Sequence, residues 1–148
     1  MTQAVAIGKS DGRLHARSQS ACFVCGQENP RGLQLQFEKG DSRESFATWS
    51  PGPIWEGFRG IVHGGLVSTV LDEAMSKAVA STGAEALTAE LRVRFHRHVA
   101  SGGVYTLRGR VVKRNRRLIQ AEATLIAADG KEHAHAWARF LTLPAERA

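Results

Sequence analysis

Cysteine and long apolar runs are both scarce in this sequence of 148 residues. Its two cysteines, Cys22 and Cys25, are too few for the disulfide framework of a small secreted domain and fit a reducing compartment. No apolar run approaches the roughly 18–20 residues that a membrane-spanning helix needs, and Met1–Arg13 lacks the apolar core of a secretory signal. We therefore expect a cytoplasmic protein with no membrane partner.

Proline is also rare, with 4 residues against 15 glycines, while apolar residues make up 43% of the chain. This is the composition of an ordinary globular protein, and the length suits one domain but not two. Residues 1–20 mix Gly, Ser, Arg and Gln without apolar periodicity. We therefore predict a flexible N-terminal leader over 1–20 and a single folded domain over 21–148.

Acidic residues are outnumbered, with 14 Asp and Glu against 20 Lys and Arg, a formal net charge of +6. Much of this excess gathers around one predicted turn, at Arg108, Arg110, Lys113, Arg114, Arg116 and Arg117. The cluster can be the solvated end of a hairpin with no function of its own. The functional alternative is a patch that binds phosphate groups. Nucleic acid is not the expected partner, because no recognition helix or aromatic stacking motif accompanies the charge.

Two short strands and an apolar loop are predicted in the first part of the domain. Apolar residues alternate in Leu33–Phe37 and again in Glu44–Trp49, with a turn at Lys39–Ser42 between them. The loop Ser50–Gly60 carries several apolar side chains, so we expect it to cover another part of the molecule.

The pattern then changes to that of a helix over Gly64–Ser81. Its apolar side chains fall in one broad stripe: Leu66, Val67, Val70, Leu71, Ala74, Met75, Ala78 and Val79. The other face is polar, and Gly83 is a natural left-handed terminator.

Four strands with apolar or small residues at every second position are predicted after the helix, at Leu87–Phe95, Tyr105–Val111, Ile119–Ala127 and Ala134–Phe140. In the first of them the predicted inward row is Leu87, Ala89, Leu91, Val93 and Phe95. Because short turns join the four strands, we expect an antiparallel meander whose apolar face is covered by the helix. The predicted fold class is α+β.

The predicted helix begins with two glycines, Gly64 and Gly65, which expose backbone N–H groups at the positive end of the helix dipole. Such a helix start can hold an anion or an oxyanion, since no side chain blocks an incoming oxygen. A tight loop-to-helix turn is the structural alternative.

Asp72 is the first carboxylate of the helix, on its polar face among small side chains. It lies roughly 10–12 Å along the axis from Gly64, too far to act on a group held there in the same chain. Two antiparallel helices related by a two-fold axis would close this gap and create composite sites in a homodimer. An exposed helix-face carboxylate is the simpler interpretation, and it suits Glu73 better than Asp72.

These residues resemble the hotdog-fold acyl-CoA thioesterases, in particular the PaaI-like and THEM-type branch. The resemblance rests on Trp55-Glu56-Gly57, Gly60, His63-Gly64-Gly65, Asp72-Glu73, Ser76-Lys77 and Arg94-Phe95. It implies a curved antiparallel sheet wrapped around one long helix. It also implies a homodimer joined through sheet edges, often paired into a tetramer.

The resemblance further implies roles for single residues. The Gly64 or Gly65 amide would polarise the thioester carbonyl beside His63, while Asp72 would act as general base or nucleophile. Thr88 matches a hydroxyl residue that helps orient the water or the carboxylate in THEM-type members. In simple alternation, however, Thr88 lies opposite the predicted inward row, so this role requires an irregular strand start or a site on that face.

Two further features concern the substrate. The basic turn would contact CoA phosphates through Arg114, Arg116 and Arg117, whose planar guanidinium groups pair well with phosphate. Several PaaI-like members have an asparagine six residues before the histidine, where this sequence has Gly57. The Asp-plus-Thr arrangement of the THEM type is therefore the closer guide.

The segment Cys22-Phe23-Val24-Cys25-Gly26 resembles half of a zinc knuckle, in which two thiolates hold one ion. The sequence holds no second cysteine pair, so a packed turn without a metal is favoured over a structural zinc. The alternating histidine pairs at 96/98 and 133/135 are interpreted as solvated side chains of the sheet face. No metal and no cofactor are expected.

The sequence therefore predicts an acyl-CoA thioesterase with Asp72 and the glycine pair at its centre. A non-catalytic acyl-CoA-binding or regulatory hotdog protein is the alternative, against which the open helix start and Asp72 weigh. An enoyl-CoA hydratase is less favoured, because no second acid–base residue is evident beside Asp72.

Overall fold

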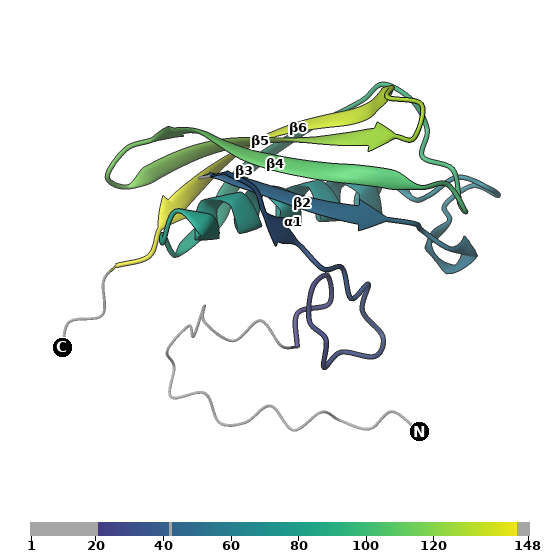
Figure 1. Ribbon diagram of the computed structural model, residues 1–148, viewed down its shortest axis with the longest axis horizontal. Helices are drawn as coiled ribbons and strands as arrows, with labels where there is room; N and C mark the ends of the chain where they lie inside the picture. Colours follow the sequence, from purple (N-terminus) through teal and green to yellow (C-terminus); the bar gives the residue numbers. More distant parts are fainter. Residues whose placement is uncertain (1–20, 42, 145–148) are drawn as a thin grey trace.

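One long helix, α1 (Gly64–Ser81), lies along a curved six-stranded antiparallel sheet (Figure 1). This architecture is that of a computed structural model, which describes residues 21–41 and 43–144. The predicted leader over 1–20 lies outside the described residues. The sheet wrapped around a single helix confirms the expected α+β class and hotdog architecture.

The sheet consists of β1 (Glu38–Lys39), β2 (Glu44–Trp49), β3 (Ala86–Phe95), β4 (Tyr105–Arg114), β5 (Leu118–Ala127) and β6 (Glu132–Thr142). A short 3-10 helix, η1 (Pro53–Trp55), precedes α1. In space the strands follow the order β1-β2-β4-β5-β6-β3, and β3 forms one edge.

This order corrects the predicted meander of the last four strands. Strands β4, β5 and β6 do follow one another, but β3 pairs with β6, and β4 pairs with β2. The residues between β3 and β4 do not form a hairpin turn, because they are hydrogen-bonded to the segment that precedes α1. Val99 is 2% exposed, and its carbonyl accepts a hydrogen bond of 2.8 Å from the Val62 amide, just before α1.

The strand predicted over Leu33–Phe37 is also wrong, since β1 spans only Glu38–Lys39. The backbone of this stretch is hydrogen-bonded to the segment before it: the Leu33 amide donates to Phe23 O at 2.7 Å, and Leu35 donates to Val24 O at 2.8 Å. Gln34 between them has a φ of 51°, which breaks an extended strand.

The helix packs closely against the sheet through the predicted stripe, of which all members except Leu66 are buried. The contact is very close at Gly109 of β4, where a Cβ would lie 2.1 Å from the Ala74 carbonyl oxygen. That oxygen accepts a hydrogen bond of 2.6 Å from the Ser45 hydroxyl of β2. Glycine at this position of β4 therefore allows the helix backbone to touch the sheet.

Strand β3 contains a bulge between Thr88 and Glu90, which alters the predicted inward row. Thr88 pairs with the buried Phe140, so directly opposite side chains place Thr88 on the helix side of the sheet. Leu87 pairs with the exposed Leu141 and thus faces away from the helix. The predicted inward placement of Leu87 is wrong because the extra residue at Ala89 shifts the alternation.

Candidate functional site

The start of α1 presents one backbone amide for binding. His63 is the N-cap residue, and its Nδ1 accepts a hydrogen bond of 2.9 Å from the Gly65 amide. The amides of Leu66 and Val67 donate to the His63 carbonyl. Among the described residues, no acceptor is hydrogen-bonded to the Gly64 amide, so in this conformation Gly64, and not Gly65, offers its N–H group.

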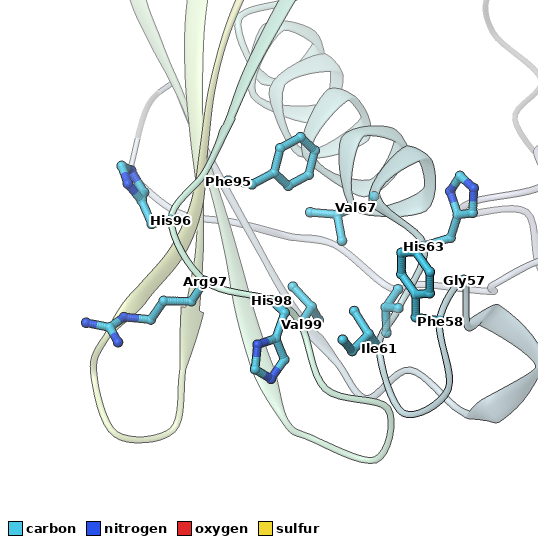
Figure 2. A pocket seen from close by; sticks show the side chains of 12 residues that line it. Gly57, Phe58, Ile61, His63, Val67, Phe95, His96, Arg97, His98 and Val99 are labelled. Carbon is cyan, nitrogen blue, oxygen red and sulfur yellow. The ribbon is translucent and has the colours of Figure 1, made fainter.

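A pocket of about 600 Å³ opens beside this helix start. Its apolar lining includes Phe58, Ile61, Val67 and Phe95, and Gly64 lies at its wall. In Figure 2 the side chains of Phe95 from β3 and Val67 from α1 point toward each other, whereas those of His96 and Arg97 point outward. The pocket can therefore take an apolar group next to a backbone N–H donor.

Asp72 and Thr88 lie together at a second place on the helix. The Thr88 hydroxyl donates a hydrogen bond of 2.8 Å to Asp72 Oδ1. Burial raises the pKa of Asp72 above its ordinary value, and the Thr88 hydrogen bond partly opposes the shift. A half-buried carboxylate of this kind is a better proton acceptor near neutral pH than an exposed one.

The Gly64 amide and Asp72 are separated within one chain. Eight residues of continuous helix place them about 12 Å apart along the axis, as the sequence predicts. Strand β3 reaches both positions: Thr88 contacts Asp72 near the start of the strand, and at its end Phe95 lies 3.6 Å from where a Gly64 Cβ would be. The two halves of the predicted site are thus arranged along one edge strand.

The basic turn lies at the other end of the helix. The Arg114 guanidinium donates a hydrogen bond of 3.1 Å to the carbonyl of Thr82, the C-cap residue of α1. Arg116 and Arg117 are exposed in the turn between β4 and β5. Because an 18-residue helix is about 27 Å long, these arginines do not contact the pocket at Gly64 of the same chain.

Sequence reasoning missed Phe95 and Val67 as the two walls of the pocket, since both read as ordinary core positions. It also missed the environment of Glu73, which was expected to be an exposed carboxylate. The Glu73 side chain is only 14% exposed, because the segment around Cys25 covers it. Burial and the neighbouring Glu73 raise the pKa of the Cys25 thiol to about 12.

Comparisons with known proteins identify the family of the chain. The family model described as "Thioesterase superfamily" matches residues 59–134. The chain is 26% identical over 132 residues to the acyl-coenzyme A thioesterase THEM4 of Bos taurus, covering 88% of this chain and 54% of the bovine protein. It thus spans about half the length of the curated relative that it matches.

Solved structures share the fold. The thioesterase superfamily protein RHA08564 has 27% identity and a TM-score of 0.77, covering 80% of this chain and 62% of that one. The smu.793 protein from Streptococcus mutans, solved bound to acetyl CoA, has 18% identity and a TM-score of 0.71. The match covers 76% of this chain and 91% of the streptococcal one. At that identity the second likeness shows the fold alone.

A single long helix wrapped by an antiparallel sheet defines a hotdog domain. The chain belongs to the thioesterase superfamily, and the THEM-type resemblance is confirmed. None of the helices in the described part of the chain is long and apolar enough to cross a membrane.

Proposed function

We propose that the protein is an acyl-CoA thioesterase that acts as a homodimer. Each site would combine Asp72 and Thr88 of one subunit with the Gly64 amide of the partner subunit. The observation that carries the proposal is the hydrogen bond between Thr88 and the half-buried Asp72. Thr88 belongs to the edge strand β3, whose last residue, Phe95, lies next to Gly64.

The free edge of β3 supports the dimer. This strand pairs with β6 on one side, and no described strand pairs with it on the other. Its apolar side chains Leu91 and Phe95 are 38% and 52% exposed, as expected of a surface that a second copy covers. Two such edges pairing antiparallel, centred near Leu91 and Arg92, would bring Thr88 beside Phe95 of the partner subunit.

That register would also join the two halves of the site. Thr88 lies at Asp72 and Phe95 lies at Gly64, so the Asp72 carboxylate would face the helix start of the partner subunit. The β3 edges would continue the sheet from one subunit into the next. A monomer that retains full activity in light-scattering and kinetic measurements would contradict this arrangement.

The chemistry follows from the two groups. The Gly64 amide donates a hydrogen bond to the thioester carbonyl oxygen, where negative charge develops. Asp72 accepts a proton from water as the water oxygen attacks the carbonyl carbon, and Thr88 holds the carboxylate in place. The carbon–sulfur bond then breaks and the CoA thiolate leaves. Asp72 donates the proton that it took from water to the thiolate sulfur, which gives the CoA thiol and restores the carboxylate. Direct attack by the Asp72 carboxylate is the alternative first step.

The pocket beside Gly64 suits the acyl group, because its lining is mostly apolar and it adjoins the proposed donor. A substrate of the acyl-CoA class is supported by the name of the bovine relative and by acetyl CoA bound to the streptococcal protein. Contacts of Arg114, Arg116 and Arg117 with the CoA phosphates, and pairing of dimers into a tetramer, stay predictions.

The test compares Asp72→Asn with the wild type on a panel of acyl-CoA thioesters, following the released thiol. Turnover should fall by at least about 100-fold while acyl-CoA binding, measured by calorimetry, changes little, because asparagine keeps the shape but cannot accept the proton. Asp41→Asn, at an exposed aspartate, is the matched control and should keep full activity. Binding of acyl-CoA without hydrolysis by the wild type would favour a non-catalytic acyl-CoA-binding protein instead.

A further inference from the structure

Two cysteines and a glutamate from distant parts of the chain come together beneath the N-terminal segment. The ligand atoms of Cys22, Cys25 and Glu73 all lie within 4.8 Å of one another. Within residues 21–41 and 43–144, this is the one group of three metal-ligating side chains brought so close. The cysteines come from the turn before β1, whereas Glu73 belongs to α1.

We propose that Cys22, Cys25 and Glu73 bind one thiophilic divalent cation, with Zn²⁺ as the favoured ion, and that the ion fastens the N-terminal segment to α1. Neither the family assignment nor the proposed thioesterase reaction requires this site. Sequence spacing does not reveal the third ligand, because Glu73 lies in α1, far along the chain from the two cysteines.

The backbone around the cysteines already has the shape of a tight ligand turn. The Gly26 amide donates a hydrogen bond of 2.8 Å to the Cys22 carbonyl, closing a turn that brings both thiols to one side. The segment is anchored in the core by Val24, which is 2% exposed, and by Leu35, which is 7% exposed. The two thiols are therefore held against the helix and not at the end of a loose arm.

The ligand set and its spacing suit zinc. In a tetrahedral site with zinc–sulfur bonds of about 2.3 Å, two thiolates lie about 3.8 Å apart, so the observed grouping needs only a small contraction. Thiolates select zinc-like ions over Mg²⁺ or Ca²⁺, and a carboxylate is an accepted zinc ligand. A water molecule would complete the coordination.

The charges around the cluster also balance. Two thiolates and one carboxylate carry three negative charges, which Zn²⁺ and the Lys77 ammonium together neutralise. Lys77 Nζ lies 4.0 Å from Glu73 Oε1. A carboxylate as covered as Glu73 needs such compensation, because burying a charge is costly unless it is paired or bound to a metal. The bound cation would also favour the thiolate form of both cysteines.

The test measures zinc binding to the full chain after removal of metal with a chelator under reducing conditions. Isothermal titration with ZnCl₂ should show one ion per chain with a dissociation constant below about 1 µM, and the ion should raise the melting temperature. Co²⁺ in place of Zn²⁺ should give the near-ultraviolet absorption of thiolate-to-cobalt charge transfer.

Variants then assign the ligands. Cys22→Ser and Cys25→Ser should each abolish the charge-transfer band and the zinc-dependent rise in melting temperature. Glu73→Gln should weaken zinc binding by at least about tenfold and alter the visible cobalt spectrum. Glu28→Gln, an exposed glutamate on the same segment, is the matched control and should bind zinc as the wild type does.

Three outcomes would overturn the proposal. They are the absence of zinc binding to the reduced wild type, a dissociation constant above about 1 µM, and unchanged affinity and cobalt spectrum in Glu73→Gln. Circular dichroism of the metal-free variants keeps these outcomes separate from unfolding. Because zinc binding is measured without substrate, failure of this proposal and failure of the thioesterase proposal are distinguishable.

Discussion

At the scale of single residues, the site depends on one extra residue in β3. Without the bulge at Ala89, simple alternation would turn Thr88 away from the helix. With it, the Thr88 hydroxyl reaches Asp72 Oδ1 at 2.8 Å. The side chain that positions the proposed base is therefore placed by an irregularity of the backbone, which is a common device next to active sites.

Replacing Thr88 tests this positioning role. Thr88→Val keeps the shape but removes the hydroxyl, so kcat should fall roughly 10- to 100-fold, the range expected for losing a hydrogen bond to a charged group. KM should change little. Thr88→Ser should restore most of the activity, a rescue that a purely structural role would not produce. Thr106→Val, on the exposed face of β4, is the matched control and should leave kcat unchanged.

The helix start shows a second residue-scale effect. The motif His63-Gly64-Gly65 predicts two available amides, but the imidazole of His63 occupies one of them. The histidine thus caps the helix, and Gly64 is left to bind the substrate oxygen in the proposed mechanism. Sequence spacing cannot reveal this division, because it depends on the rotamer of the His63 side chain.

At the scale of elements, the close contact between α1 and the sheet allows us to predict how a substitution changes the free energy of unfolding. Gly109→Ala would place a methyl group against the Ala74 carbonyl, so it should lower the free energy of unfolding by about 1–3 kcal/mol, as overpacking does. Gly52→Ala is the matched control, since Gly52 has a φ of −87° and its added Cβ would meet nothing within 4 Å. Urea denaturation of both variants checks this, and equal stabilities would contradict the contact.

The elements also show how far sequence patterns carry. The helix and the inward rows of β4, β5 and β6 are predictable, because buried side chains repeat with the period of their element. The partner of β3 is not predictable, since alternation says which face is buried but not which strand lies alongside. The strand prediction for the stretch before β1 is wrong for a related reason. The apolar residues of this stretch are packed, but its backbone is hydrogen-bonded to the segment before it and not to the sheet.

At the scale of the whole molecule, several large apolar side chains are exposed in the single chain, as expected of a surface that another subunit covers. Phe58 is 82% exposed and Ile54 is 81% exposed, although both lie in the loop that the sequence predicts to be a cover. Phe95, at the end of the free edge strand, is 52% exposed and shares the pocket with Phe58. The apolar loop and the edge strand thus belong to one region, which fits burial by a second subunit.

A mixing experiment can decide whether the site is shared between subunits. Gly64→Pro removes the amide hydrogen, and proline is well tolerated at the first position of a helix. His63 before it has φ −56° and ψ 130°, the backbone conformation that a following proline requires. This variant should therefore fold and be inactive, as Asp72→Asn should be.

Mixing the two inactive variants under conditions that exchange subunits should restore activity. Half of the dimers would then be mixed, and each would contain one intact site built from the Asp72 of one subunit and the Gly64 amide of the other, so about one quarter of the wild-type activity should return. Mixing Asp72→Asn with the double variant Asp72→Asn/Gly64→Pro should restore none, because no intact site can form. If the first mixture also stays inactive while mass spectrometry shows mixed dimers, the amide and the carboxylate do not act across the interface, and the composite site is wrong.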